Sequence, residues 1–159
     1  RTKHVGLLYK QLKKDSSKSR GGMPDYLMTF IKPGDNAELI THDPSDFPVE
    51  QWQEWASPVW MSVNQTRVLN VKAARNANDE RHLCPLQLDV IDRALVMWSN
   101  PGDVVLSPFM GIGSEGYCSL KAKRRFVGVE LKAEYFNQAC RTLHDVEASA
   151  ATLFDEMAA

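Results

Sequence analysis

Cysteine is scarce in this sequence, which holds only Cys84, Cys118 and Cys140 among 159 residues and no CxxC pair. A disulfide framework or a zinc site needs more cysteines at closer spacing, so we predict reduced thiols, with Cys118 and Cys140 buried, and no metal. Long apolar runs are also missing, and the first residues lack the pattern of a signal peptide. These absences predict a cytoplasmic protein without a membrane segment.

An excess of one charge is absent as well, because 19 Lys and Arg residues stand against 20 Asp and Glu residues. This balance neither supports nor excludes nucleic acid, so any DNA contact would have to come from a local basic patch. The length and the hydrophobic fraction of 43% suit one globular domain. Because the chain opens on Arg1 and enters a helix-like segment, we expect its first elements to belong to a larger protein.

The first half of the chain predicts few regular elements. Apolar residues at helical spacing predict a helix over residues 3–14, and the small, polar and basic residues 15–24 predict a flexible loop. The β-rich residues 26–31 predict a strand. Residues 34–81 contain several prolines, which predicts irregular structure with one short helix over residues 48–55.

The second half predicts alternating strands and helices. A helix is expected over residues 85–99, opened by Pro85, with a buried side formed by Leu86, Val90, Ile91, Leu95 and Trp98. The expected order then continues as strand 103–106, loop 107–113, helix 114–122, strand 125–130 and a helix from residue 133. The tail from about residue 147 either extends that helix or frays. This alternation predicts an α/β fold with a parallel, doubly wound sheet covered on both faces, of which the chain supplies a part.

The loop of the strand–loop–helix unit is rich in glycine. Gly111 and Gly113 let the backbone turn sharply and approach a ligand, and Ser114 can then start the helix. Glu130 ends the next strand, nineteen positions after Gly111, where a carboxylate can accept both hydroxyl groups of a ribose. A purely structural strand-to-helix turn is the less favoured interpretation.

The same glycines, together with Gly116, satisfy the GxGxxG pattern of nicotinamide and flavin enzymes. In those enzymes the first glycine follows the strand at once, whereas here residues 107–110 intervene and Pro108 ends the strand early. A nicotinamide-dependent oxidoreductase therefore stays open as an alternative.

The segments HLCPLQ at 82–87, SPFMGIGS at 107–114 and GVE at 128–130 together resemble the β-class amino-methyltransferases of DNA. The resemblance continues into residues 124–128 and Tyr135. It implies a Rossmann-like fold that binds S-adenosylmethionine, with the loop around the methionine part, the Glu on the ribose and the Pro-opened helix beside the amino-acid end. The residues that it assigns to the cofactor are His82, Cys84, Pro85, Ser107, Pro108, Phe109, Gly111, Gly113, Ser114 and Glu130.

Two positions depart from the family pattern: Ser107 replaces an Asp, and Cys84 replaces a Lys found in many members. Both departures weaken the expected contacts to the cofactor but leave the backbone of the glycine loop free to surround it. The segments at 6–34 and 47–60 also resemble adenine-methylating enzymes of phage or prophage origin, of the kind found in restriction-modification. The resemblance divides the chain into the C-terminal part of a catalytic and DNA-contacting half at 1–81, a cofactor-binding βαβ region at 82–146 and a tail at 147–159.

The catalytic motif of this family, [DNS]-P-P-[YFW], holds the target amino group and stacks on a flipped base. It is absent from the chain, and Asp43-Pro44-Ser45-Asp46 lacks its second Pro and its aromatic residue. No catalytic residue is assigned, and the motif is expected before Arg1. The implied function is methyl transfer to the amino group of adenine in double-stranded DNA, with cytosine as runner-up. An inactive fragment that only binds, and a homodimer, stay open.

Candidate DNA contacts lie in the first basic segment. Phosphate groups are contacted by Lys, Arg and hydroxyl side chains, so we assign Lys13, Lys14, Ser16, Ser17, Lys18 and Arg20 to the DNA backbone. A solvated charge run is an almost equally favoured interpretation of these residues. The tryptophans at 52, 55 and 60 could stack on bases, but we expect them to pack in a core.

Overall fold

The computed structural model describes residues 13–15, 17, 24–69 and 85–157, with side chains described up to residue 149. Contacts divide the chain into two units, 1–37 and 38–159, and each is considered by itself. In the described part of the first unit, residues 24–37 contain no strand, and Phe30 and Ile31 are almost fully exposed. The predicted strand at 26–31 is therefore wrong, because β-rich residues form a strand only where a second strand pairs with them. The predicted helix at 3–14 lies almost entirely outside the described residues.

The second unit begins with a short helix, α2 (Val49–Ala56), which confirms the expected helix with a shift of one residue. Pro48 caps it with extended backbone instead of lying within its first turn. Phe47 is buried beside α2, where its ring contacts the rings of His42 and Trp55 at centroid distances of 4.9 and 5.2 Å. This aromatic cluster fixes the chain that leads into α2.

Helix α3 (Leu88–Trp98) begins three residues later than predicted. Residues 85–87 are not helical, and the N–H of Leu88 donates a hydrogen bond to the carbonyl oxygen of Arg67. Pro85 therefore lies before the helix instead of opening it. The first N–H group of the helix, that of Leu88, is satisfied by the distant Arg67 carbonyl. Burial of Ile91 and Leu95 is as predicted, whereas Leu86 and Trp98 are nearly half exposed.

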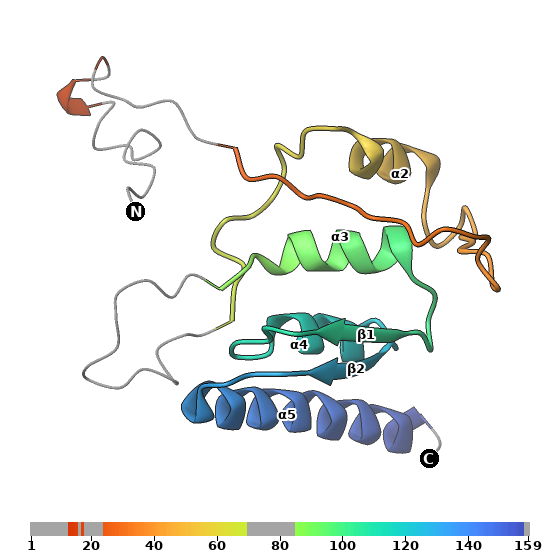
Figure 1. The fold of residues 1–159 in the computed structure, drawn as a ribbon, viewed down its shortest axis with the longest axis vertical. Coiled ribbons are helices and arrows are strands. Elements are labelled where there is room, and N and C mark those ends of the chain that lie inside the picture. The colour runs from red at the N-terminus through yellow and green to blue at the C-terminus, as the bar shows by residue number, and fades with distance from the viewer. Residues whose placement is uncertain (1–12, 16, 18–23, 70–84, 158–159) are drawn as a thin grey trace. The chain divides into compact units, whose positions relative to one another are not determined.

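A parallel pair of strands forms the centre of this unit: β1 (Val104–Ser107) and β2 (Arg125–Gly128). Helix α4 (Ser114–Lys121) connects them, and α5 (Ala133–Met157) follows β2. The residues after 147 thus continue the helix (Figure 1). This order confirms the predicted α/β class with a parallel sheet. In the described part of the chain, no helix is long and apolar enough to cross a membrane.

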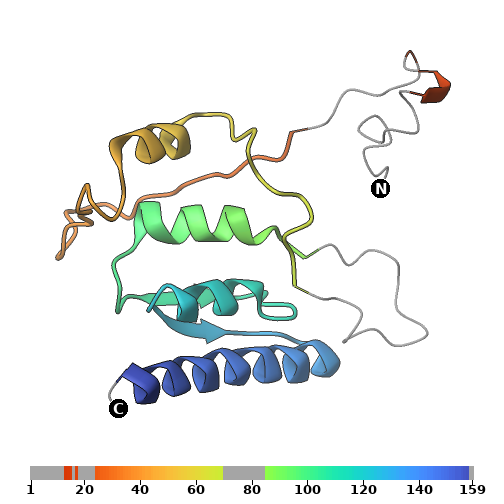
Figure 2. The same ribbon diagram turned by 180° about the vertical axis from the view of Figure 1, so that it is seen from behind.

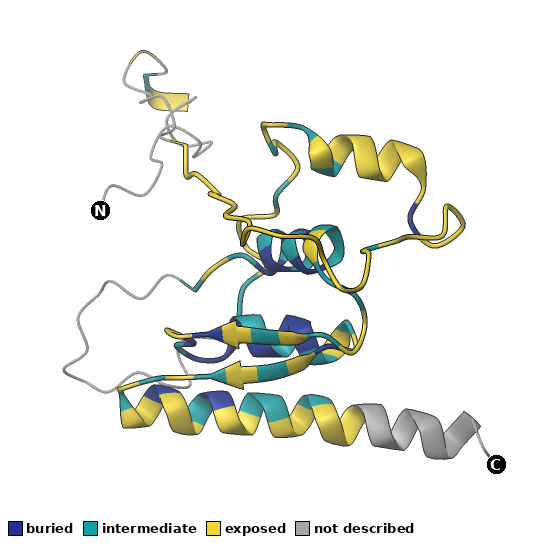
Figure 3. Ribbon diagram, turned by 45° about the vertical axis from the view of Figure 1, so that its right-hand side comes forward, coloured by how far each residue is buried: buried dark blue, intermediate teal, exposed yellow. Residues whose placement is uncertain are grey.

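Helix α4 covers one face of this two-stranded sheet. It packs against both strands and also contacts α3 and α5. It lies behind the strands in Figure 1 and in front of them in Figure 2, which shows the opposite side. A Cβ atom on Gly116 would lie 2.7 Å from the Phe126 ring, so glycine permits this approach. The other face stays exposed (Figure 3), with at least half of each side chain accessible at Val104, Leu106, Val127 and Val129. Coverage of both faces is therefore not found among the described residues.

The cysteines only partly follow prediction. Cys118 is buried and free, and burial raises the pKa of its thiol far above the usual range. Cys140 is free but exposed, which corrects its predicted burial, because the buried side of α5 is formed by Tyr135 and Ala139, four residues apart on one face. Cys84 lies outside the described residues.

Arg124 joins the end of α3 to the turn before β2. It is 8% exposed, and its guanidinium donates hydrogen bonds to the carbonyl oxygens of Ser99 at 2.7 Å, Ala122 at 2.5 Å and Leu95 at 3.3 Å. Carbonyl groups at a helix C-terminus lack partners within the helix and attract a positive charge. Arg124 therefore completes the C-terminus of α3.

We expect Arg124→Ala to lower the free energy of unfolding by about 3 kcal/mol, because the partly buried carbonyl groups of Ser99 and Ala122 lose the donor that Arg124 supplies, whereas that of Leu95 keeps its bonds from Ser99. Chemical denaturation of both proteins measures the change. The neighbouring Arg125→Ala is the control, since Arg125 is exposed and its Nε donates to Gly102. Equal losses in the two variants would contradict the capping role of Arg124.

Candidate functional site

The glycine turn lies between β1 and α4. Gly111 has a φ of 54° and Gly113 a φ of 90°, a region that side chains other than glycine rarely adopt. Gly113 is the N-cap of α4 and Ser114 is its first helical residue, with no hydrogen bond from a capping side chain. The prediction that Ser114 starts the helix is thus correct for position but not for side-chain capping, because the N-cap position is held by Gly113, which has no side chain.

The two glycines serve different needs. A Cβ atom on Gly113 would lie 3.1 Å from the Cβ and 3.3 Å from the Cα of Ala139 in α5, so this glycine permits close packing. A Cβ atom on Gly111 would meet nothing within 4 Å, so open space adjoins this glycine. Gly111 is therefore the glycine whose backbone a ligand can approach.

β2 ends at Gly128, two residues before its predicted end, and Glu130 faces this turn from the segment that follows the strand. Its Oε2 accepts a hydrogen bond from the N–H of Gly111 at 2.9 Å, and its Oε1 accepts one from the N–H of Lys132 at 2.9 Å. The backbone adds two bonds, Met110 N–H to Val129 O and Val129 N–H to Ser107 O, each 2.9 Å long. The structure thus joins the two features that the sequence placed nineteen residues apart.

The other predicted cofactor residues differ in exposure. Ser107 is buried at the end of β1, whereas Pro108 and Phe109 are exposed, Phe109 by 84%. Pro85 is partly buried before α3. His82 and Cys84 lie outside the described residues.

Behind the turn lies a contact that sequence patterns did not predict. Leu69 packs against Ile112 and Tyr135, which are both buried, and also against the cluster formed by α3 and α4. The ammonium group of Lys132 lies 4.2 Å from the centre of the Tyr135 ring. Leu69 stands in a segment without periodicity, so no local signal indicated this role.

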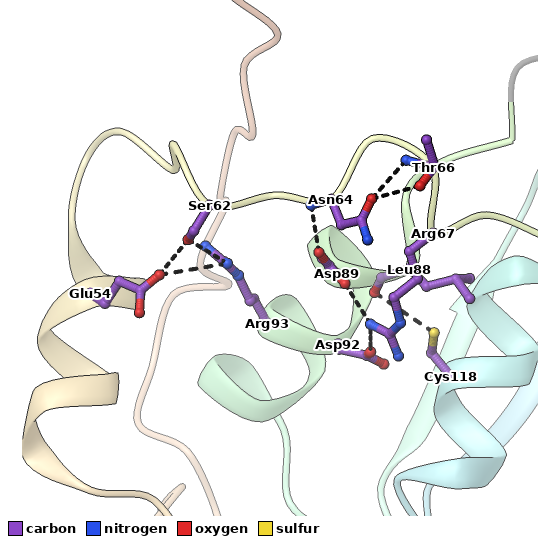
Figure 4. A network of polar contacts seen from close by, with 10 residues as sticks. All are labelled: Glu54, Ser62, Asn64, Thr66, Arg67, Leu88, Asp89, Asp92, Arg93 and Cys118. Atoms are coloured by element: carbon purple, nitrogen blue, oxygen red, sulfur yellow. Dashed lines mark hydrogen bonds and ion pairs between the residues drawn. The ribbon is translucent and has the colours of Figure 1, made fainter.

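Arg67 holds the segment that carries Leu69 on α3 (Figure 4). Its Nη1 lies 2.6 Å from both Asp89 Oδ1 and Asp92 Oδ2, and Asp89 Oδ2 accepts the N–H of Asn64 at 2.7 Å. Burial alone would raise the pKa of Asp89, but the bonds from Arg67 and Asn64 outweigh it and lower that pKa. The Asp89 carboxylate therefore stays charged, and its contact and that of Asp92 keep Arg67 in place.

Arg93 forms a second group of contacts on α3. Its side chain is 7% exposed, and its guanidinium carbon lies 5.5 and 5.2 Å from the ring centres of Trp55 and Trp60. Its Nη2 donates to Ser62 at 2.9 Å and lies 3.8 Å from Glu54 (Figure 4). These two tryptophans therefore pack as predicted, against a buried arginine that the sequence pattern did not indicate, whereas Trp52 is half exposed.

The nearest string to a catalytic motif has a structural role. Asp43 Oδ1 accepts hydrogen bonds from the N–H of Ser45 at 2.8 Å and from its hydroxyl at 2.7 Å, which lowers the pKa of Asp43. The Asp43 carbonyl oxygen accepts the N–H groups of Asp46 and Phe47. This carboxylate closes a turn, an arrangement typical of an Asx-turn.

Of the predicted DNA contacts, Lys13, Lys14 and Ser17 are described and exposed. Ser17 donates hydrogen bonds from its N–H and its hydroxyl to Asp15. Ser16, Lys18 and Arg20 lie outside the described residues.

Glu115 stands in the first turn of α4, directly after the glycine turn. Burial raises the pKa of its carboxyl above the ordinary value of 4.5, although its own N–H opposes the shift. The folded state thus prefers the neutral acid, so the stability that it contributes is complete below about pH 4 and is lost as pH rises through the folded pKa.

We expect Glu115→Gln to reduce the loss of thermal stability between pH 4 and pH 7, because glutamine does not titrate. Unfolding midpoints across this range measure the effect. Glu147→Gln, at an exposed position of α5, should follow the wild-type profile. A Glu115→Gln profile parallel to that of the wild type would contradict the assignment.

A glycine turn that opens a helix, with a carboxylate that follows the neighbouring parallel strand, is typical of α/β proteins that bind a nucleoside-containing ligand. A family model described as DNA methylase, N6_N4_Mtase, matches residues 2–141. The chain therefore belongs to this DNA methylase family, which disfavours the nicotinamide alternative.

The known proteins that are similar to the chain include the following three. The type II methyltransferase M1.MboII of Moraxella bovis is 41% identical over 66 residues, which are 42% of this chain and 25% of that protein. The DNA adenine methyltransferase YhdJ of Escherichia coli K12 is 27% identical over 146 residues, or 89% of this chain and 46% of that protein. The chain thus spans less than half of each of these relatives.

The third is TTHA0409 of Thermus thermophilus, whose structure was solved with S-adenosyl-L-methionine. Its structure matches with a TM-score of 0.53 at 23% identity, over 78% of this chain and 48% of that chain. The match supports the Rossmann-like α/β fold.

Proposed function

We propose that the protein carrying this chain is a DNA methyltransferase that uses S-adenosylmethionine and modifies the amino group of adenine in double-stranded DNA. The hydrogen bond between Gly111 and the Glu130 carboxylate is the observation that carries the proposal. It unites an open glycine backbone with an acceptor for ribose hydroxyl groups at one point, which is the arrangement that a nucleoside cofactor needs.

The residues at this point fit S-adenosylmethionine. Open space adjoins Gly111, and each Glu130 oxygen has a lone pair left after its backbone bond. The N-terminus of α4, which is the positive end of the helix dipole, lies at Gly113 and favours the carboxylate of the cofactor's methionine part. When bound, the cofactor supplies a methyl group on a positively charged sulfur.

The contribution of this chain is positioning. Glu130 would hold the ribose, and the turn around Gly111 would hold the methionine part, so that the methyl group faces one direction. His82, Cys84, Pro85, Ser107, Pro108, Phe109, Gly113 and Ser114 would complete the site. Transfer to a fixed acceptor nitrogen depends mainly on alignment, because alignment removes much of the entropic barrier.

Adenine is favoured over cytosine because YhdJ, which aligns with 89% of the chain, is named a DNA adenine methyltransferase. The type II methyltransferase relatives support a role in restriction-modification. Residues 38–66 carry acidic side chains and no Lys or Arg, so the basic segment with Lys13, Lys14, Ser16, Ser17, Lys18 and Arg20 is the better candidate for phosphate contact.

We expect the 159-residue chain alone to transfer no methyl group, because it lacks an acceptor motif for the base and the Asp43 carboxylate closes a turn. The full-length protein should transfer labelled methyl from S-adenosylmethionine to unmethylated DNA. Mass spectrometry of the nucleosides identifies the target base. Methyladenine would support the proposal, and methylcytosine would show that the target is cytosine instead. Binding without transfer by the full-length protein would favour a binding module, and transfer by the chain alone would restore Asp43 as a catalytic candidate.

A further inference from the structure

We propose that Glu130 has a second role, that of a positioning residue which holds the glycine turn in its ligand-binding shape before any ligand arrives. The inference rests on the proposed function, in which the same carboxylate accepts the ribose hydroxyl groups. One side chain would then both contact the ribose of S-adenosylmethionine and hold the turn that surrounds its methionine part.

The hydrogen bonds of the turn show how Glu130 acts on it. β2 ends at Gly128, but Val129 still pairs with the first half of the turn through its N–H to Ser107 and its carbonyl oxygen to Met110. At the next position the Glu130 side chain continues this pairing and accepts the N–H of Gly111 at 2.9 Å. A carboxylate thus takes the place of a backbone acceptor, and it binds the one glycine of the turn that adjoins open space.

The orientation of the carboxylate is itself fixed. Oε1 accepts the N–H of Lys132 at 2.9 Å while Oε2 accepts that of Gly111, so the two oxygens are held by backbone on both sides. N–H bonds to a charged acceptor are about twice as strong as bonds between neutral groups. The half-buried Glu130 therefore ties the turn to the start of α5.

The two roles are compatible within one carboxylate. Each oxygen has two lone pairs and uses one for its backbone N–H, so one on each oxygen is left for a ribose hydroxyl. Binding of the ribose should therefore retain the bond to Gly111. It follows that loss of Glu130 harms the methionine side of the site even when no ribose hydroxyl is present.

A ligand without ribose hydroxyl groups separates the two roles. Calorimetry would compare S-adenosylhomocysteine with its 2′,3′-dideoxy analogue on the full-length wild type, Glu130→Ala and Glu130→Gln. A carboxylate that only binds ribose predicts equal affinity of the wild type and Glu130→Ala for the dideoxy analogue. We expect Glu130→Ala to bind this analogue about tenfold more weakly, because the Gly111 N–H has lost its charged acceptor.

The affinity of Glu130→Gln for the dideoxy analogue should lie between those of the wild type and Glu130→Ala. Its amide oxygen can accept one of the two N–H bonds, whereas its NH₂ group cannot accept the other. Glu147→Ala, which removes an exposed carboxylate from α5, should bind like the wild type. Thermal unfolding identifies a variant that fails to fold, and if alanine fails, glutamine carries the comparison.

Amide hydrogen exchange of the ligand-free proteins gives a second measurement. We expect faster exchange across residues 108–113 in Glu130→Ala than in Glu147→Ala. Equal affinities for the dideoxy analogue together with unchanged exchange would overturn the second role. A wild type that binds neither ligand would contradict the proposed function instead, while the exchange comparison would still decide whether Glu130 holds the turn.

Discussion

Gly113→Ala is expected to destabilise the protein by about 3 kcal/mol, because it combines two costs at one position. A φ of 90° strains any residue with a Cβ atom, and that atom would lie 3.1 Å from Ala139. Relief of this contact would require α5 to move away from the turn, at the expense of its packing against α4. Thermal and chemical unfolding measure the loss.

Gly111→Ala is the matched variant two residues earlier. Its φ of 54° costs an alanine about 1 kcal/mol, and its Cβ atom would meet no protein atom within 4 Å. The variant should fold but bind S-adenosylmethionine more weakly, because the alanine side chain would occupy the open space beside the turn. A Gly111→Ala protein with wild-type affinity, or a Gly113→Ala protein as stable as Gly111→Ala, would contradict this division of roles.

Replacement of Lys14, Lys18 and Arg20 by alanine in the full-length protein is expected to weaken binding to every DNA duplex. Phosphate contacts release counterions and are largely independent of sequence, so three real contacts should reduce the slope of log affinity against log salt by about three. Affinity for S-adenosylmethionine should not change. Titration of labelled duplexes at several salt concentrations gives the slope.

Arg141→Ala supplies the control for this experiment, because Arg141 is an exposed cation on α5. Its slope should equal that of the wild type. An unchanged slope in the triple variant would show that residues 14–20 form a solvated surface without contact to DNA.

Several elements could be predicted because their signals are local. The spacing of Gly111 and Glu130 indicated a nucleoside site, and the strand–loop–helix–strand pattern around the glycines placed β1, α4 and β2 within one or two residues of their bounds. The expected strand at 26–31 failed for the opposite reason. Its residues favour extended structure, but a strand depends on a pairing partner that no local pattern reports.

The sequence by itself thus determined the α/β order, the glycine turn and the family, since short periodic and motif signals encode them. Only the tertiary structure decided that α3 begins at Leu88, because the acceptor of that N–H is Arg67. It also decided that Arg93 and Arg124 are buried, and that the Glu130 carboxylate reaches Gly111. These features depend on groups far apart in the chain, whose meeting is set by packing and hydrogen-bond geometry, and a local pattern contains no record of either.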